Sequence, residues 1–202
     1  MEVSFGANYI NKASVVKMPN KMPTRVEAAI VELDPKNYGD WFALEAFVED
    51  NAGGKYATDI KNSFIDVMNG IIVNNNLHHY MLTLQNSDFE HLDPLAVLGT
   101  CMVVKKLKLS PKRKESLGVQ TEHATKIRFL QGAPKNHYGN VDREYSETGK
   151  AIRDFVVNNE KEDDILVHVD KAAIPFYTAQ GFEPCPNPCA ADMMIYHIRK
   201  KK

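Results

Sequence analysis

The chain has 202 residues, of which 44% are hydrophobic and 25% charged, and its formal net charge is −1. This balance is typical of an ordinary globular protein with one well-buried core, and it gives no overall drive toward nucleic acid or membranes. No apolar run approaches the roughly 20 residues of a membrane span, and the first residues lack the pattern of a secretory signal. Three cysteines do not suggest a disulfide framework. We therefore expect a cytoplasmic protein.

The hydrophobic pattern predicts an N-terminal arm, residues 1–24, with one strand at 13–17, and a single domain over residues 25–202. Strands are expected at 25–33, 79–84, 95–109, 124–130, 165–169 and 193–198. Helices are expected around 41–48, 58–72, 152–156 and 171–180. This order predicts an α/β (α+β) class, with antiparallel strands first and a strand–helix–strand crossover later.

Residues 165–182 form the stretch around which the rest of the chain is organised. Ile165–Val169 is short, apolar and β-branched, which predicts a buried strand. Asp170 has the short accepting side chain of a helix N-cap, and Gly181 suits the left-handed conformation of a helix end. Pro175 lies inside the helix expected at residues 171–180, so we expect that helix to be irregular.

The spacing Asp170-x-x-Ala173-x-x-x-Tyr177-x-x-x-Gly181-Phe182 resembles the N-x-x-A-x-x-(F/L)-Y-x-x-x-G-F segment of the GNAT superfamily, the acyl-CoA-dependent N-acetyltransferases. Asp170 stands where asparagine is usual. The order of elements over residues 25–198 is also that of the GNAT fold. The resemblance implies a mixed, largely antiparallel central sheet flanked by helices, with acetyl-CoA or another acyl-CoA as co-substrate and no metal. Asp170, Ala173 and Tyr177 would then contact the cofactor.

Acyl transfer from CoA also needs a pyrophosphate site, and the start of a helix offers one because its free amides and dipole favour an anion. The family pattern is (Q/R)-x-x-G-x-(G/A), and residues 146–151, SETGKA, keep the Gly-x-Ala and lack the Gln or Arg. Lys150 or Arg143 would add positive charge, whereas Glu144 and Glu147 oppose an anion. The alternatives are an ordinary capped helix and a rival small-residue loop at 136–139. The residues expected to bind phosphate are Ser146, Thr148, Gly149, Lys150 and Ala151.

The resemblance assigns further roles. The backbone of Phe129, Leu130 and Gln131 would pair with the pantetheine arm, in a strand that splays from its neighbour. Tyr177 would protonate the departing thiolate, because a phenol with a pKa near about 10 is protonated at neutral pH. A core tyrosine is the alternative. Glu122 and His123 precede the strand that should flank the acyl group, and Glu122 is our candidate base. Glu32 and His79, on or near other strands, are alternatives, and a water chain would serve as well.

Three other features of the sequence bear on binding: a basic cluster, a pair of cysteines and a loop between two expected helices. The basic residues between 105 and 114 are expected to be a solvated hairpin rather than a nucleic-acid site. Cys185 and Cys189 lack the partners of a zinc site. In GNAT relatives the first two helices border the acceptor site, so the loop between them, residues 50–56, is expected to shape specificity.

These observations lead to two hypotheses. The first is an N-acetyltransferase that moves an acyl group from acetyl-CoA to a primary amine, of a small molecule or a peptide, by direct attack. The second is a GNAT-like module that binds or regulates without catalysis. Neither a nucleic acid nor a membrane is expected as a partner, and a homodimer is left open.

Overall fold

The computed structural model describes residues 6–18, 23–50, 57–69, 76–133, 136, 142–187 and 190–198. The strands are β1 Asn8–Lys17, β2 Thr24–Glu32, β3 Leu77–Thr83, β4 Val97–Leu107, β5 Ala124–Gly132, β6 Tyr145–Ser146, β7 Asp164–His168, β8 Glu183–Pro184 and β9 Met193–Tyr196. The helices are α1 Tyr38–Asp50, α2 Ala57–Met68, α3 Pro111–Leu117, α4 Thr148–Asn159 and α5 Ile174–Thr178, with 3₁₀ turns η1 Pro94–Ala96 and η3 Lys171–Ala173.

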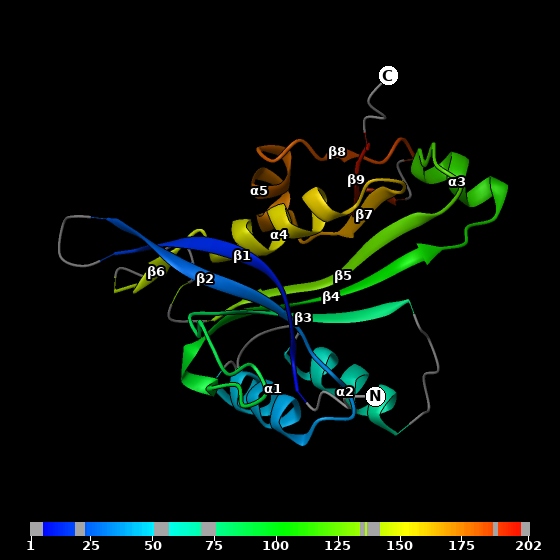
Figure 1. The fold of residues 1–202 in the computed structure, drawn as a ribbon. Coiled ribbons are helices and arrows are strands. Elements are labelled where there is room, and N and C mark those ends of the chain that lie inside the picture. The colour runs from blue at the N-terminus through cyan, green and yellow to red at the C-terminus, as the bar shows by residue number, and fades with distance from the viewer. Residues whose placement is uncertain are drawn as a thin grey trace. The chain divides into compact units, whose positions relative to one another are not determined.

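The described strands form one nine-stranded mixed sheet in the order β6-β1-β2-β3-β4-β5-β7-β9-β8 (Figure 1). β5 and β7 pair in parallel, whereas β1 with β2, β2 with β3 and β7 with β9 are antiparallel. This arrangement confirms the predicted class, a mixed and largely antiparallel sheet with helices beside it. The parallel pairing of β5 with β7 corresponds to the crossover through α4 that the sequence predicted.

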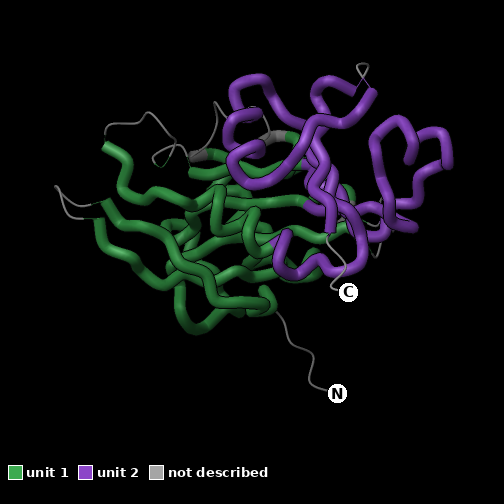
Figure 2. Tube along the Cα trace, turned by 90° about the horizontal axis from the view of Figure 1, so that it is seen from above, with its two compact units in different colours: residues 1–102, 129–155 green, residues 103–128, 156–202 purple. Residues whose placement is uncertain are grey.

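The chain divides into two compact units, drawn in different colours in Figure 2: residues 1–102 with 129–155, and residues 103–128 with 156–202. In the first unit, Leu44 of α1 and Phe64 of α2 share a buried cluster with Val31 of β2 and Met81 of β3. Because side chains alternate along a strand, Tyr80 lies on the opposite face. There its ring centroid is 5.0 Å from that of Phe155 in α4. Helices therefore cover both faces of this part of the sheet.

The second unit has a smaller core of its own. Leu117, Leu166 and Ile195 belong to one buried cluster, which brings α3, β7 and β9 together. Asp164 is almost fully buried at the start of β7 and is satisfied by backbone amides. Its Oδ2 accepts from the amide of Gln120 at 2.7 Å, and its Oδ1 accepts from that of Ile198 at 3.1 Å. A buried carboxylate needs such donors, and here they join three segments of the chain.

The basic segment expected to be a hairpin contains the helix α3, so that prediction was wrong. Ser110 caps the helix, since its Oγ accepts from the amide of Arg113 at 3.4 Å, and Pro111 occupies the first turn. Gly118 ends it with φ 75°, and its amide donates to the Glu115 carbonyl. The turn signals were present in the sequence. A seven-residue helix that buries only Leu117 gives no apolar periodicity to reveal it.

Other element boundaries differ in smaller ways. The N-terminal strand extends over 8–17 and pairs with β2 along that length. The strand predicted at 95–109 begins at Val97, because Asp93 Oδ1 accepts from the Leu95 amide at 2.9 Å and starts a 3₁₀ turn instead. The expected end of the second helix, at residue 72, lies outside the described residues.

Candidate functional site

The start of α4 carries the predicted phosphate residues. Thr148 opens the helix, and Glu147 just before it has φ 64°, a left-handed conformation rare for a side chain of this kind. The Ala151 amide already donates to the Glu147 carbonyl at 2.8 Å. By helix geometry, the amides of Thr148, Gly149 and Lys150 have no partner within the helix. The anion-accepting part of this turn is therefore residues 148–150, and Ala151 contributes only its small side chain.

The carboxylate of Glu147, which would repel an anion at this turn, is paired with two cations. Glu147 Oε2 lies 3.2 Å from Arg25 Nη2, and Glu147 Oε1 lies 3.8 Å from Lys150 Nζ. The two ion pairs reduce the repulsion that the sequence predicts from Glu147. Arg25 comes from β2, and its position beside the turn was missed by sequence reasoning. No local pattern relates residues 122 positions apart.

The start of α4 also meets the end of β5. A Cβ added to Gly132 would lie 3.3 Å from Thr148 Oγ1, so the backbone of β5 closely approaches the side chain that opens α4. The ladder between β5 and β7 runs from Ala124 with Asp164 to Ile127 with Val167. β5 itself continues to Gly132. Its last residues, among them the predicted Phe129, Leu130 and Gln131, thus lie beyond that ladder.

These three residues differ in their surroundings. Phe129 is half-buried and packs against the core beneath α1 and α2. Leu130 is half-buried as well, and Gln131 is buried. The Gln131 side chain is turned back on its own strand, since its Nε2 donates to the Gly132 carbonyl at 3.1 Å. Any role of this segment toward a ligand would therefore fall on its backbone.

The helix that carries Tyr177 begins irregularly, as Pro175 predicted. It starts as η3 and continues as α5, and Gly181 ends it with φ 85°, as expected. The Phe182 amide donates to the Tyr177 carbonyl at 3.1 Å. Tyr177 itself is 6% exposed, and its ring packs edge-on against Phe176 at 5.0 Å and Phe182 at 5.3 Å. This aromatic packing holds the phenol in one orientation.

Asp170 does not cap the helix with its side chain, which corrects our expectation. Its carbonyl accepts from the Ala173 amide at 2.8 Å, and no side-chain cap bond forms. A 3₁₀ start satisfies the first amide by a backbone bond, so the carboxylate is not required there. Ala173 is half-buried at the end of this turn.

Glu122 lies just before β5 and is solvated. Its side chain is 88% exposed, and its Oε1 is 3.9 Å from His123 Nε2. Its carbonyl accepts from Lys114 Nζ at 3.4 Å. Glu122 and the segment from Phe129 to Gln131 stand at opposite ends of β5.

A buried arginine on α4 was not predicted. Arg153 is 6% exposed, and its Nη2 lies 2.6 Å from Asp154 Oδ1. Its Nε is buried without a hydrogen-bond partner among the described residues. Arg153 follows Gly149 by one helical turn, so it adds a cation to the face of α4 that begins at the small-residue turn.

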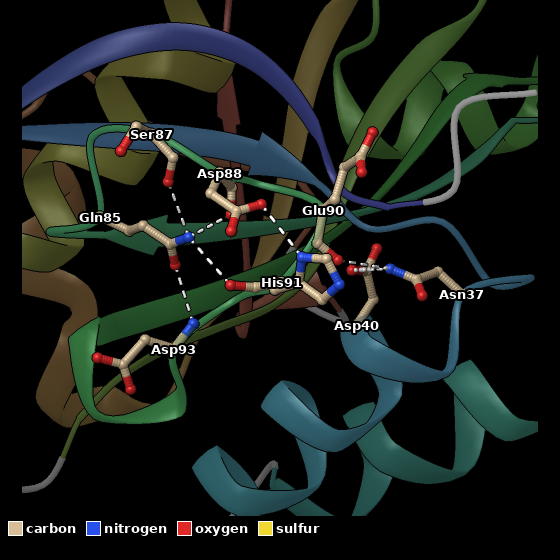
Figure 3. A network of polar contacts seen from close by, with 8 residues as sticks. All are labelled: Asn37, Asp40, Gln85, Ser87, Asp88, Glu90, His91 and Asp93. Atoms are coloured by element: carbon tan, nitrogen blue, oxygen red, sulfur yellow. Dashed lines mark hydrogen bonds and ion pairs between the residues drawn. The ribbon is translucent and has the colours of Figure 1, made fainter. Parts of the chain in front are cut away.

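A separate cavity of about 390 Å³ lies in the first unit, beside the segment from Leu84 to Asp93. Gln85 shapes this segment: its Nε2 donates to the carbonyls of Ser87, Asp88 and His91, and its Oε1 accepts from the Asp93 amide at 2.9 Å (Figure 3). One amide group thus closes the whole loop. The cavity lining combines the stacked rings of Tyr9 and Phe89 with Lys12 and Glu27. No sequence motif indicated it.

Within the described ranges, no group of three or more His, Cys, Asp or Glu is placed to hold a metal ion. Cys101 and Cys185 are buried free thiols, and burial raises the pKa of Cys185 to about 11. No described helix has the length and apolar character needed to cross a membrane. Cys189, the acceptor loop at 50–56 and all of the rival loop except Asn136 lie outside the described residues.

No family model matches the sequence, and no curated protein is significantly similar to it. Similar folds exist among solved structures. A tyrosine-to-phenylalanine mutant of the toxin AtaT, bound to the C-terminus of the antitoxin AtaR and acetyl-CoA, has a TM-score of 0.51 at 12% identity and covers 84% of this chain and 92% of its own. AtaT is a GNAT acetyltransferase. The chain has the GNAT fold.

Two further structures share lower similarity with this GNAT fold. The KacTA–DNA complex has a TM-score of 0.45 at 12% identity, with 68% of this chain and 79% of that chain covered. Arabidopsis thaliana NAA60 in complex with a bisubstrate analogue has a TM-score of 0.43 at 14% identity, with 70% and 84% covered. The likeness to the AtaT mutant confirms the GNAT fold that the element order and the Tyr177 motif predicted.

Proposed function

We propose that this protein is an N-acyltransferase that moves an acyl group from acetyl-CoA, or another acyl-CoA, to a primary amine by direct attack. One observation carries the proposal: the small-residue start of α4 abuts the end of β5 at Gly132, beyond the point where the ladder with β7 ends. Free helix amides and an extended strand beside them suit a pyrophosphate and an amide-bearing arm, respectively.

The phosphate groups are assigned to the amides of Thr148, Gly149 and Lys150. Ser146, which replaces the usual Gln or Arg, and the small Ala151 keep the approach open to the backbone. Lys150 and Arg25 supply positive charge, since each is already placed beside Glu147. The pantetheine arm is assigned to the backbone of Phe129, Leu130 and Gln131, and Asp170 and Ala173 border the cofactor on the Tyr177 helix.

When bound, acetyl-CoA supplies the thioester whose carbonyl the amine attacks. Tyr177 is the proposed acid, since its phenol donates a proton to the thiolate sulfur as the carbon–sulfur bond breaks. Its aromatic neighbours Phe176 and Phe182 fix the ring, and the surrounding burial keeps competing water away from it. The amine must lose its proton as well, and Glu122 or a water takes it.

The acceptor is proposed to be a small-molecule or peptide amine. The compared GNAT structures include one with a bisubstrate analogue and others with an antitoxin peptide or DNA. Those ligands are ligands of those proteins.

The test is an acyl-transfer assay with acetyl-CoA and a panel of amines and peptides, following free thiol. Tyr177→Phe should lower kcat about 100-fold, the scale of general acid catalysis, with little change in CoA affinity. Glu122→Gln should shift the rising limb of the pH profile if Glu122 is the base, and leave it in place if water is. Absence of any CoA binding, together with transfer to no amine, would favour the second candidate, a GNAT-like binding or regulatory module. The missing Gln or Arg at Ser146 motivates that candidate.

A further inference from the structure

A second cavity, of about 510 Å³, lies within the second unit under α3. Its lining comes from β4, β5, β7, β9 and the segment around α3. Figure 1 shows α3 just after the C-terminal end of β4. The cavity contains none of the residues assigned above to the cofactor or to catalysis. Its size is in the range of small-ligand pockets, about 300–1,000 Å³.

The polar part of the lining has one sign of charge. Lys108, Arg113, Lys126 and Arg128 line the cavity, and no lining residue is acidic. Lys126 and Arg128 are two positions apart on β5, so they lie on one face of the strand. Arg113 approaches the same face from α3. Such a concentration of like charge attracts anions and repels cations.

The charge on Lys126 is poorly compensated. Burial lowers its pKa, the charges of Arg128 and Arg113 lower it further, and Asp192 opposes them. Asp192 is itself hydrogen-bonded to His168, so Lys126 does not have this carboxylate to itself. A half-buried cation under repulsion from two others costs the unliganded fold stability, and natural proteins keep such costs mainly where function needs them.

The floor of the cavity is aliphatic. Leu107, Leu117, Leu166 and Met193 line it, and no aromatic residue does. Leu166 pairs with Lys126 across the β5–β7 ladder, so charge and apolar surface are direct neighbours. Single-stranded nucleic acids are held by aromatic stacking beside a basic groove, and this lining offers no ring on which a base would stack.

We propose that this cavity binds a small amphiphilic anion, a ligand with a phosphate or carboxylate group and a short aliphatic part. The anionic group lies between Lys126, Arg113 and Arg128, and the aliphatic part covers the leucines and Met193. Phosphate and carboxylate share this chemistry, and the probes below separate them. The site is independent of the acyl-transfer proposal, since it uses none of the same residues.

Isothermal titration of the full chain with hexyl phosphate, hexanoate, inorganic phosphate and hexanol tests the proposal. We expect saturable binding of at least one hexyl anion, at least tenfold tighter than inorganic phosphate or hexanol. The tighter of hexyl phosphate and hexanoate then identifies the anionic group. Equal affinity for hexyl phosphate and inorganic phosphate, or no saturable binding of either hexyl anion at millimolar concentration, would overturn the proposal.

Variants place the binding in this cavity. Lys126→Met and Arg113→Gln should each weaken the hexyl anion at least fivefold. Lys112→Gln, an exposed neighbour on α3 outside the lining, should leave it unchanged and is the matched control. Lys126→Met should also raise the melting temperature of the unliganded protein, because it removes the repelled cation, so weaker binding cannot be attributed to misfolding. Equal losses in Lys112→Gln and Arg113→Gln would show diffuse surface binding and contradict the assignment.

A nucleic acid or an acidic peptide is the other possible occupant of a basic surface. If a single-stranded oligonucleotide or an acidic peptide binds with a dependence on Lys126 while both hexyl anions fail, the small-ligand proposal is wrong and the surface serves a macromolecule.

Discussion

The start of α4 and the cavity under α3 are both suited to an anion, but they are built from different groups. The start of α4 uses backbone amides and small residues, and its nearest side chain, Glu147, is acidic and held by two cations. The cavity under α3 uses four cationic side chains and no acidic one. A site made of backbone tolerates sequence change, whereas a site made of side chains depends on every charge.

That difference explains why the sequence shows part of a known pattern at one site and no pattern at the other. The start of α4 keeps only Gly149 and Ala151 of the family pattern, yet the geometry that exposes the first amides is intact. The cavity under α3 has no pattern, because Lys108, Arg113, Lys126 and Arg128 come from different elements. Changes in charge, salt and helix caps should therefore affect the two sites differently.

The largest expected effect concerns Asp40, because its own carboxylate is a buried anionic group. Its carboxylate is buried and accepts from the Asp34 amide at 2.7 Å and from Asn37 Nδ2 at 2.8 Å. Burial raises the pKa of Asp40 to about 6, so between about pH 4 and pH 6 the folded state binds more protons than the unfolded state. Stability contributed by this group therefore falls as the pH rises through that window. Over that window, the free energy of unfolding of Asp40→Asn should fall by about 3 kcal/mol less than that of the wild type.

Urea unfolding of both proteins at pH 4, 5, 6 and 7 measures the effect. If the free energy of unfolding changes with pH equally in both proteins, Asp40 does not titrate in this window.

Salt should separate the two anion sites. Raising NaCl from about 50 to 500 mM screens exposed side-chain charges most strongly, so hexyl phosphate should lose about tenfold in affinity. CoA, held in part by backbone amides at residues 148–150, should lose less. Calorimetric titrations of both ligands at the two concentrations provide the comparison. A steeper salt dependence for CoA would reverse the assignment of backbone and side-chain sites.

Helix caps provide a third contrast, between Ser110 and Asp170. Ser110 Oγ accepts from the Arg113 amide, whereas Asp170 makes no side-chain cap bond. Ser110→Ala should cost about 1 kcal/mol of unfolding free energy. Asp170→Ala should cost less than Ser110→Ala, because it removes no cap bond. Chemical denaturation of the two variants decides the matter, and an equal or larger loss in Asp170→Ala would contradict these cap geometries.

The smallest effect concerns the ion pairs at the start of α4. Arg25→Gln leaves Glu147 with Lys150 alone, which should weaken CoA binding about threefold, the scale of an exposed ion pair. Adding Glu147→Gln should restore the affinity, since the opposing charge is then gone. A further loss in the double variant would mean that Glu147 supports the turn in another way.

The sequence predicted the Tyr177 segment well because its signals are local. Gly181 with φ 85° and the irregular start at Pro175 follow from the conformational limits of those two residues. The same kind of signal at Ser110 and Gly118 was overlooked, because α3 is short and its face is lysine-rich. Asp170 shows the converse limit, since a residue suited to capping does not have to cap.

The rest depends on contacts distant in sequence. Arg25 reaches Glu147 across 122 positions, and Arg153 becomes buried only when α4 packs. Neither relation has a spacing rule that a single sequence displays. The Gln85 loop is similar: a glutamine after a strand is ordinary, and its four hydrogen bonds appear only when the loop closes (Figure 3).

Thermal unfolding with and without CoA, in the wild type and in Gly149→Leu, tests whether CoA binds at the start of α4. At a hundredfold excess over its dissociation constant, a ligand specific to the folded state adds about 2.7 kcal/mol of stability. We expect this gain in the wild type and in the control Asn158→Leu, at an exposed position of the same helix, and its loss in Gly149→Leu. Leucine favours helix over glycine, so the loss would not reflect unfolding. Equal stabilisation of Gly149→Leu, or none of the wild type, would contradict the cofactor site at the start of α4.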